Sequence, residues 1–221
     1  MAIVYTPDNC TEFQDSPTKL SVFLAGTIDN GASVDWQQEL IKLLANNDNI
    51  VLYNPRKASW DKNAGPEAVE KQARWELEMQ DKADLVVMNI LPGSQSPICL
   101  LELGLHLGQK KPIMLACSKG YWRYTNVRVT AQRYMQDGFA ILDNSKPGYM
   151  ADIAHELDQV RACMVDMVLG YVDKDGRATL MGLAAERLAS AGETRIPRPC
   201  WMKSENQKPD HVYHFEYIIG D

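Results

Sequence analysis

Short apolar runs alternate with longer amphipathic stretches along most of the chain. The runs predict buried strands, because each is continuous, strand-sized and bounded by glycine, proline or polar residues. They cover residues 21–26, 49–55, 84–91, 111–117 and 138–144. The stretches between them carry apolar residues every three or four positions, which is typical of helices that pack on a core. They cover residues 34–47, 66–83, 96–108 and 149–169.

The residues at the helix starts support these boundaries. Ser33 is expected to cap the helix near Trp36, and Ser96 the helix that begins at Pro97. Pro66 and Pro97 suit the first helical position, where no backbone N–H is needed. The alternation of strands and helices predicts an α/β fold, with a doubly wound, parallel, five-stranded sheet and helices on both faces.

The chain divides into three parts on this pattern. Residues 1–20 are expected to be an N-terminal extension, and residues 21–170 one α/β domain. After residue 170 the alternation weakens. Residues 178–191 read as a helix, and the remainder of 171–221 as an extended tail ending in a candidate strand. We expect this C-terminal extension to pack on the domain or to reach a neighbouring subunit.

Composition and charge narrow the classes of partner. A net charge of −6 without a basic run argues against binding a nucleic-acid polymer. The apolar runs are too short to span a membrane, and the first residues lack the pattern of a signal peptide. Five widely spaced cysteines suggest reduced thiols in a cytoplasmic protein. The four histidines form no metal-binding pattern, so we expect no metal.

Polar residues follow the first three predicted strands of the domain, at the point where each strand ends. In open parallel sheets, ligands bind beyond the carboxyl ends of the strands. These loops contain neither the dinucleotide nor the triphosphate glycine motif, so no nucleotide cofactor is expected. The candidate ligand-binding residues in them are Gly26, Thr27, Asp29, Asn30, Asn54, Arg56, Gly93, Ser94, Gln95 and Ser96.

Two acids are candidates for catalysis. Glu102 lies about a turn and a half into the helix after the third strand, among apolar neighbours. This position is close to the ligand edge, by which we mean the carboxyl ends of the strands and the loops that follow them. A position near the helix amino end favours the ionised form that a nucleophile needs. Glu76 lies in the preceding helix. The alternative for either acid is an ordinary solvated helix position. Trp36, beside the first loop, could stack on a nucleobase, although a helical tryptophan more often packs in the core.

Six segments occur in an order that resembles the nucleoside 2-deoxyribosyltransferase family, and in particular its nucleoside 2-deoxyribosyltransferase-like branch. They span residues 21–127. The most specific signal is the segment QARWELEMQDKADLVVMNI followed by the segment SPICLLELGLHLG. The segments are SVFLAGTI, DWQQEL, LYNPRKASWD, QARWELEMQDKADLVVMNI, SPICLLELGLHLG and YWRYTNV.

The resemblance implies a flavodoxin-like fold and a double-displacement reaction without a cofactor. A glutamate at the position of Glu102 attacks C1′ of a 2′-deoxynucleoside, and an acid at the position of Glu76 protonates or binds the leaving base. Members often carry an acid six residues before the nucleophile, where this chain has Ser96. They are usually homo-oligomers whose sites are completed by a neighbour's carboxy-terminal segment.

The resemblance therefore predicts transfer of 2-deoxyribose between nucleobases on a small nucleoside or nucleotide substrate. Catalysis is assigned to Glu102 and Glu76. Substrate binding is assigned to Gly26, Asp29, Trp36, Asn54, Arg56, Ser94 and Ser96. Two alternatives remain open. One is hydrolysis of a nucleoside 5′-monophosphate, with Arg56 and the loop at Ser94 receiving the phosphate. The other is a non-catalytic nucleotide-binding or sensor module.

Overall fold

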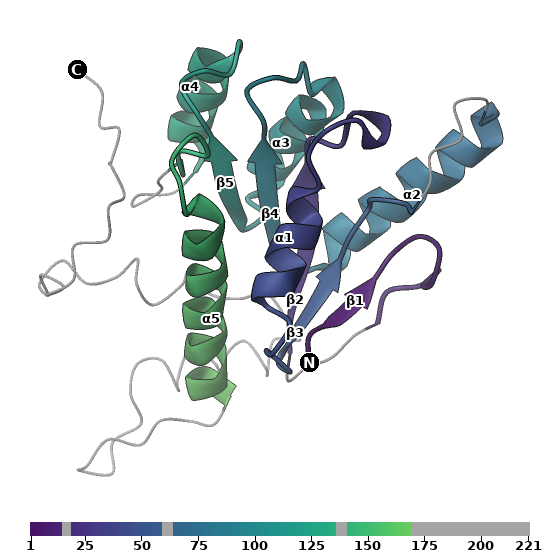
Figure 1. Cartoon of the computed structure of the whole chain (residues 1–221), viewed down its shortest axis with the longest axis vertical. Helices are drawn as coiled ribbons and strands as arrows, with labels where there is room; N and C mark the ends of the chain where they lie inside the picture. The colour runs from purple at the N-terminus through teal and green to yellow at the C-terminus, as the bar shows by residue number, and fades with distance from the viewer. Residues whose placement is uncertain (15–18, 59–63, 136–140, 169–221) are drawn as a thin grey trace, which may run out of the picture.

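A computed structural model describes residues 1–14, 19–58, 64–135 and 141–168 of the chain (Figure 1). Its centre is a five-stranded sheet in which every paired strand runs parallel to its neighbour. The strand order is β1-β3-β2-β4-β5. The strands are β1 (Ile3–Tyr5), β2 (Leu20–Gly26), β3 (Ile50–Tyr53), β4 (Leu85–Ile90) and β5 (Ile113–Cys117).

Helices cover both faces of this sheet (Figure 1). α1 and α5 pack on one face, and α2, α3 and α4 on the other. The helices are η1 (Asp29–Gly31), α1 (Trp36–Leu43), α2 (Pro66–Lys82), α3 (Pro97–Gln109), α4 (Tyr124–Tyr134) and α5 (Tyr149–Val168). The predicted α/β class, with a parallel five-stranded sheet between two helical layers, is confirmed. The order β3-β2-β4-β5 is that of a flavodoxin-like, doubly wound fold.

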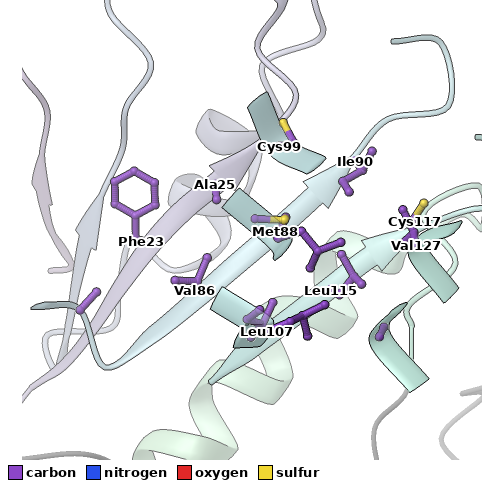
Figure 2. Close-up of a cluster of buried hydrophobic side chains, with 14 of the residues drawn as sticks. Phe23, Ala25, Val86, Met88, Ile90, Cys99, Leu107, Leu115, Cys117 and Val127 are labelled. Carbon is purple, nitrogen blue, oxygen red and sulfur yellow. The ribbon is translucent and has the colours of Figure 1, made fainter. Parts of the chain in front are cut away.

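The core divides into two apolar layers because strand side chains alternate between the faces of the sheet. Figure 2 shows the layer beneath α3, in which Cys99 and Leu107 belong to the same apolar cluster as Met88 of β4. Leu115 of β5 belongs to the same layer. Cys99 and Cys117 are buried free thiols. This packing fixes α3, and with it Glu102, against the carboxyl half of β4.

The structure differs from the sequence-based prediction in the identity of one strand. Ile3–Tyr5, expected to be part of an extension, forms β1 and pairs with β3. Three residues are too few to show a periodicity, so this strand could not be predicted from the local pattern. It forms because its backbone pairs with β3. The strand expected at residues 138–144 appears as a single bridge between Leu142 and Ala116. Residues 138–140 of that segment, like the whole 171–221 extension, lie outside the described residues.

Two local expectations about helices are also corrected. The side chain that caps α1 is Asp35, which accepts a hydrogen bond from the backbone N–H of Gln38 at 3.0 Å. Ser33, the expected cap, instead donates to the Ile28 carbonyl at 3.0 Å. Helix α4 was not predicted, because its sequence mixes β-branched and polar residues. It forms because Tyr124, Val127 and Ala131 share a face that is buried in the core. No helix within the described residues is both long and apolar enough to cross a membrane.

Candidate active site

The carboxyl ends of β2 and β4 approach each other closely at Gly26, which no other residue could replace without strain. Gly26 has a φ of +136°, and a Cβ added to it would lie 2.3 Å from the carbonyl oxygen of Asn89. The next backbone N–H, that of Thr27, donates to the same oxygen at 2.9 Å. The hydroxyl of Thr27 accepts from the backbone N–H of Leu91 at 2.9 Å. The loops that leave these two strands are therefore held side by side.

A hydrogen-bonded cluster, which we call the serine cluster, connects these two loops. It consists of Thr27, Asp29, Ser94 and Ser96. The hydroxyls of Thr27 and Ser96 lie 2.7 Å apart, and the backbone N–H of Ser96 donates to Ser94 Oγ at 3.0 Å. Ser94 Oγ in turn donates to Asp29 Oδ1 at 2.6 Å. The structure thus brings together three residues that the sequence assigned to the substrate site.

The backbone in and around the serine cluster adopts an uncommon conformation. Asp29, Asn30 and Ser96 all have left-handed backbones, with φ values of 49°, 53° and 44°. Each such residue costs roughly 1 kcal/mol or more and persists only where surrounding contacts impose it. Ser96 occupies the N-cap position of α3, as predicted, but its side chain makes no capping hydrogen bond. Its hydroxyl is directed instead into the serine cluster.

Arg56 and Asn54 brace the first loop. The Arg56 guanidinium donates to the carbonyl oxygens of Gly31 at 3.0 Å and Ser33 at 2.9 Å. Its Nε also lies 3.4 Å from the Asp35 carboxylate. Asn54 Oδ1 accepts from the Arg56 backbone N–H at 3.0 Å. The donors of Arg56 are thus engaged with protein groups in this structure.

Trp36 lies in the core and not on the ligand edge. It is 1% exposed and belongs to the apolar layer beneath α1 and α5. Its indole N–H donates to the Thr27 carbonyl at 3.0 Å. Trp36 therefore supports the loop after β2 from below.

The two predicted catalytic acids come from neighbouring helices and are each held by a glutamine amide. Glu102 of α3 accepts a hydrogen bond from Gln80 Nε2 at 2.6 Å. Glu76 of α2 accepts one from Gln72 Nε2, also at 2.6 Å. The Gln72 amide donates as well to the Pro55 carbonyl at 3.1 Å, which ties α2 to the loop after β3. Both carboxyl groups are half-buried.

Burial changes the proton affinity of both acids. It raises the pKa of Glu102 to about 7, against a lowering effect of the Gln80 hydrogen bond and with a further rise from the charge of Glu76. It also raises the pKa of Glu76, opposed by the Gln72 hydrogen bond and by the charge of Lys57. The two carboxyl groups therefore interact electrostatically across α2 and α3, as a catalytic pair does.

Cys99 connects this acid pair with the serine cluster. Its pKa is raised to about 12, by burial first and then by the negative charge of Glu102, with a smaller contribution from Asp29. A hydrogen bond with Ser96 acts in the opposite direction. The thiol is therefore close to the acid pair and to the serine cluster at once. Among the described residues, no group of three or more His, Cys, Asp or Glu side chains could hold a metal ion.

The residues that hold the two acids were not predicted from the sequence. Gln72, Glu76 and Gln80 are spaced four residues apart on α2, and Glu102 and His106 are four apart on α3. Residues at this spacing share one face of a helix. The sequence signals that could have identified them are the polar stripe on α2 and the carboxylate–histidine pair on α3. The fact that the two stripes face each other came from the tertiary structure.

Comparison with known proteins agrees with the sequence motifs. Residues 19–121 match the family model described as nucleoside 2-deoxyribosyltransferase like. This range includes β2, α2, β4 and α3, which carry both acids. The match confirms the family resemblance predicted from the motifs and supports a related glycosyl-transfer function.

The other comparisons found little. Among solved structures, a conserved protein from Enterococcus faecalis V583 is similar, with 18% sequence identity and a TM-score of 0.42. The similarity covers 64% of this chain and 98% of that one. No curated protein matches the sequence.

Proposed function

We propose that this protein transfers 2-deoxyribose between nucleobases through a covalent intermediate on Glu102. The observation that supports this most directly is the acid pair. Two half-buried carboxyl groups from different helices interact electrostatically, next to a strained polar loop at the carboxyl end of a parallel sheet. Ligands of such sheets bind at this edge. Two carboxyl groups are also what cleavage of a glycosidic bond requires.

In the first half of the proposed reaction, the ionised Glu102 carboxylate attacks C1′ of the nucleoside. A C1′–O bond to Glu102 forms as the C1′–N bond breaks, and the bonding electrons leave with the base. Glu76, whose pKa is also raised by burial, is assigned as the acid that donates a proton to the departing base nitrogen. In the second half, the nitrogen of an acceptor base attacks C1′, Glu76 takes up its proton, and Glu102 is released.

The serine cluster is assigned to sugar binding in this proposal. Asp29 is exposed, and one of its carboxylate oxygens is fixed by Ser94. An oriented carboxylate of this kind suits a hydrogen bond from a ribose hydroxyl. Gly26 allows the backbone after β2 to pass close to β4, so that Asp29 stands beside the beginning of α3.

The hydrolytic alternative needs a group that binds phosphate. Arg56 was the candidate, but its guanidinium is engaged with the Gly31 and Ser33 carbonyls. This favours a nucleoside over a nucleoside 5′-monophosphate as substrate. Transfer to a base, in place of water, remains part of the proposal.

We also propose that a second copy of the chain covers α3. Ile98, Leu101 and Leu105 lie on one side of this helix and are 59%, 69% and 39% exposed. Such an apolar stripe is unusual on a free surface. Because it flanks Glu102, a partner there would help to exclude water from the acid pair. Sedimentation-velocity ultracentrifugation should show a dimer or larger species, and Leu101→Glu should shift it toward the monomer.

The decisive assay follows base release by chromatography. Purified protein is incubated with each 2′-deoxynucleoside, with and without a second base, and in parallel with nucleoside 5′-monophosphates. Transfer predicts a new nucleoside that requires the acceptor base. Base release at the same rate without an acceptor would assign hydrolysis instead, and binding without turnover would assign the sensor role.

Two variants test the assigned roles. Glu102→Gln should lose at least about a thousandfold in rate, since Glu102 is the carboxylate assigned to attack C1′ and an amide is a far weaker nucleophile. Glu78→Gln is the matched control, because Glu78 is a surface acid on α2 that pairs with Lys82 at 2.6 Å. It should retain full activity. A fully active, folded Glu102→Gln protein would refute the nucleophile assignment.

A further inference from the structure

Behind Glu102 lies a chain of hydrogen-bonded side chains that runs away from the ligand edge. Gln80 of α2 donates from Nε2 to Glu102 Oε1 at 2.6 Å. The other end of the same amide, Oε1, lies 2.5 Å from Nε2 of His106 on α3. Gln80 and His106 are both 0% exposed. Water therefore has no access to the two groups behind the carboxylate.

The chemistry of the three groups fixes the direction of every hydrogen bond. An ionised carboxylate only accepts, so the amide NH₂ of Gln80 must face Glu102. The amide oxygen then faces His106 and also only accepts, so His106 must carry its proton on Nε2. Turning the amide over would place two acceptors together at Glu102 and two donors together at His106. With its proton on Nε2, His106 thus favours the amide orientation that presents the Gln80 NH₂ to the carboxylate.

His106 is suited to a fixed role because it stays neutral. Burial lowers its pKa to about 4, and the charge of Lys111 lowers it further, against opposing effects of Asp81 and Gln109. The ring is thus held in one neutral form across the pH range in which Glu102 changes charge.

We propose that Gln80 and His106 are positioning residues for Glu102, with His106 orienting the Gln80 amide so that its NH₂ holds the carboxylate ionised and aimed at the ligand edge. Neither touches the reacting atoms. The purpose of this relay rests on the proposed function, whereas its hydrogen-bond directions do not. Among the described residues, the titratable group that acts on Glu102 is Glu76 from α2, and Glu102 in turn raises the pKa of the Cys99 thiol on its own helix.

The first test is the pH dependence of turnover. If Glu102 must be ionised, kcat/KM of the wild type rises with pH through about 7. Gln80→Leu removes the donor that favours the ionised form. Its rising limb should therefore move about one pH unit higher, as expected for loss of one hydrogen bond to a charged group.

Variants of His106 separate the relay from simple packing. His106→Phe keeps a ring but no donor, so its limb should also move upward. His106→Gln offers a side-chain N–H to the Gln80 oxygen and should return the limb toward the wild-type position. In each case kcat should change more than KM. If kcat/KM rises at the same pH in the wild type, Gln80→Leu and His106→Phe, the proposal is overturned.

The second test needs no turnover and reads the wild-type chain, with a variant used only to assign signals. Two-dimensional ¹⁵N NMR of the wild-type chain reports the tautomer of each of its four histidines, and the His106 signals are those absent from His106→Gln. We expect a neutral ring protonated on Nε2, unchanged from pH 5.5 to 8. A proton on Nδ1, or titration near pH 6.5, would refute the relay. If no substrate turns over while the tautomer is as expected, the proposed function fails and the hydrogen-bond relay stands.

Discussion

Replacing Glu102 with glutamine should stabilise the folded protein, and by an amount that depends on pH. The pKa of Glu102 rises from an ordinary value of 4.5 to about 7 on folding, mainly because of burial. A carboxyl group with a higher pKa in the folded chain binds its proton more tightly there. Well below pH 4.5, Glu102 is protonated in both the folded and the unfolded chain, so its ionisation does not change the free energy of unfolding. Between 4.5 and about 7 the unfolded chain ionises first, so folding stability falls as the pH rises.

The size of this penalty follows from the two pKa values. Each tenfold difference in a protonation equilibrium is worth about 1.4 kcal/mol, so the rise from 4.5 to about 7 sets an upper limit of roughly 3.5 kcal/mol. Because Glu102 is only half-buried, solvent screening reduces this to roughly 1 to 3 kcal/mol. Glutamine is neutral, similar in shape and still able to accept from Gln80. Glu102→Gln should therefore recover most of this free energy at pH 8 and almost none at pH 4.5.

Urea unfolding of both proteins at pH 4.5, 6 and 8 measures the difference. The gain in the free energy of unfolding should grow steadily across the three conditions. Glu78→Gln provides the matched control, since Glu78 is on the surface of α2 and its replacement should change stability by a similar small amount at every pH. A Glu102→Gln difference that is the same at pH 4.5 and 8 would refute burial as the cause of the raised pKa.

Three further substitutions test the fold around the site by urea unfolding. Gly26→Ala should destabilise by about 3 kcal/mol or more, because φ is +136° and the new Cβ would lie 2.3 Å from the Asn89 backbone oxygen; wild-type stability would show that the β2–β4 junction can open. Gly104→Ala should stabilise by roughly 0.5 to 1 kcal/mol, because it lies in α3 with no neighbouring atom within 4 Å; any loss would reveal a contact on that side. Asp35→Ala should cost about 1 kcal/mol through loss of the α1 cap, and an unchanged midpoint would mean that the cap contributes nothing.

Strong local patterns explain what could be predicted from the sequence. The runs that became β2, β3, β4 and β5 are continuous and apolar because both faces of a parallel sheet are covered. Elements with weak local patterns were missed. β1 is three residues long, and α4 begins in an aromatic segment without clear periodicity. Both form because the rest of the fold offers them a pairing edge or a core surface.

The sequence by itself determined the alternation from β2 to β5, and therefore the edge at which Glu102 and Asp29 would lie. That follows from chain connectivity, since consecutive parallel strands place their carboxyl ends together. Only the tertiary structure decided what each polar side chain does there. It turned Arg56 and Trp36 toward supporting the first loop, joined Ser94 and Ser96 to Asp29, and set Gln80 between Glu102 and His106. The Arg56–Ser33, Ser94–Asp29 and Gln80–Glu102 contacts join residues 23, 65 and 22 positions apart, and no local periodicity encodes which helix face meets which.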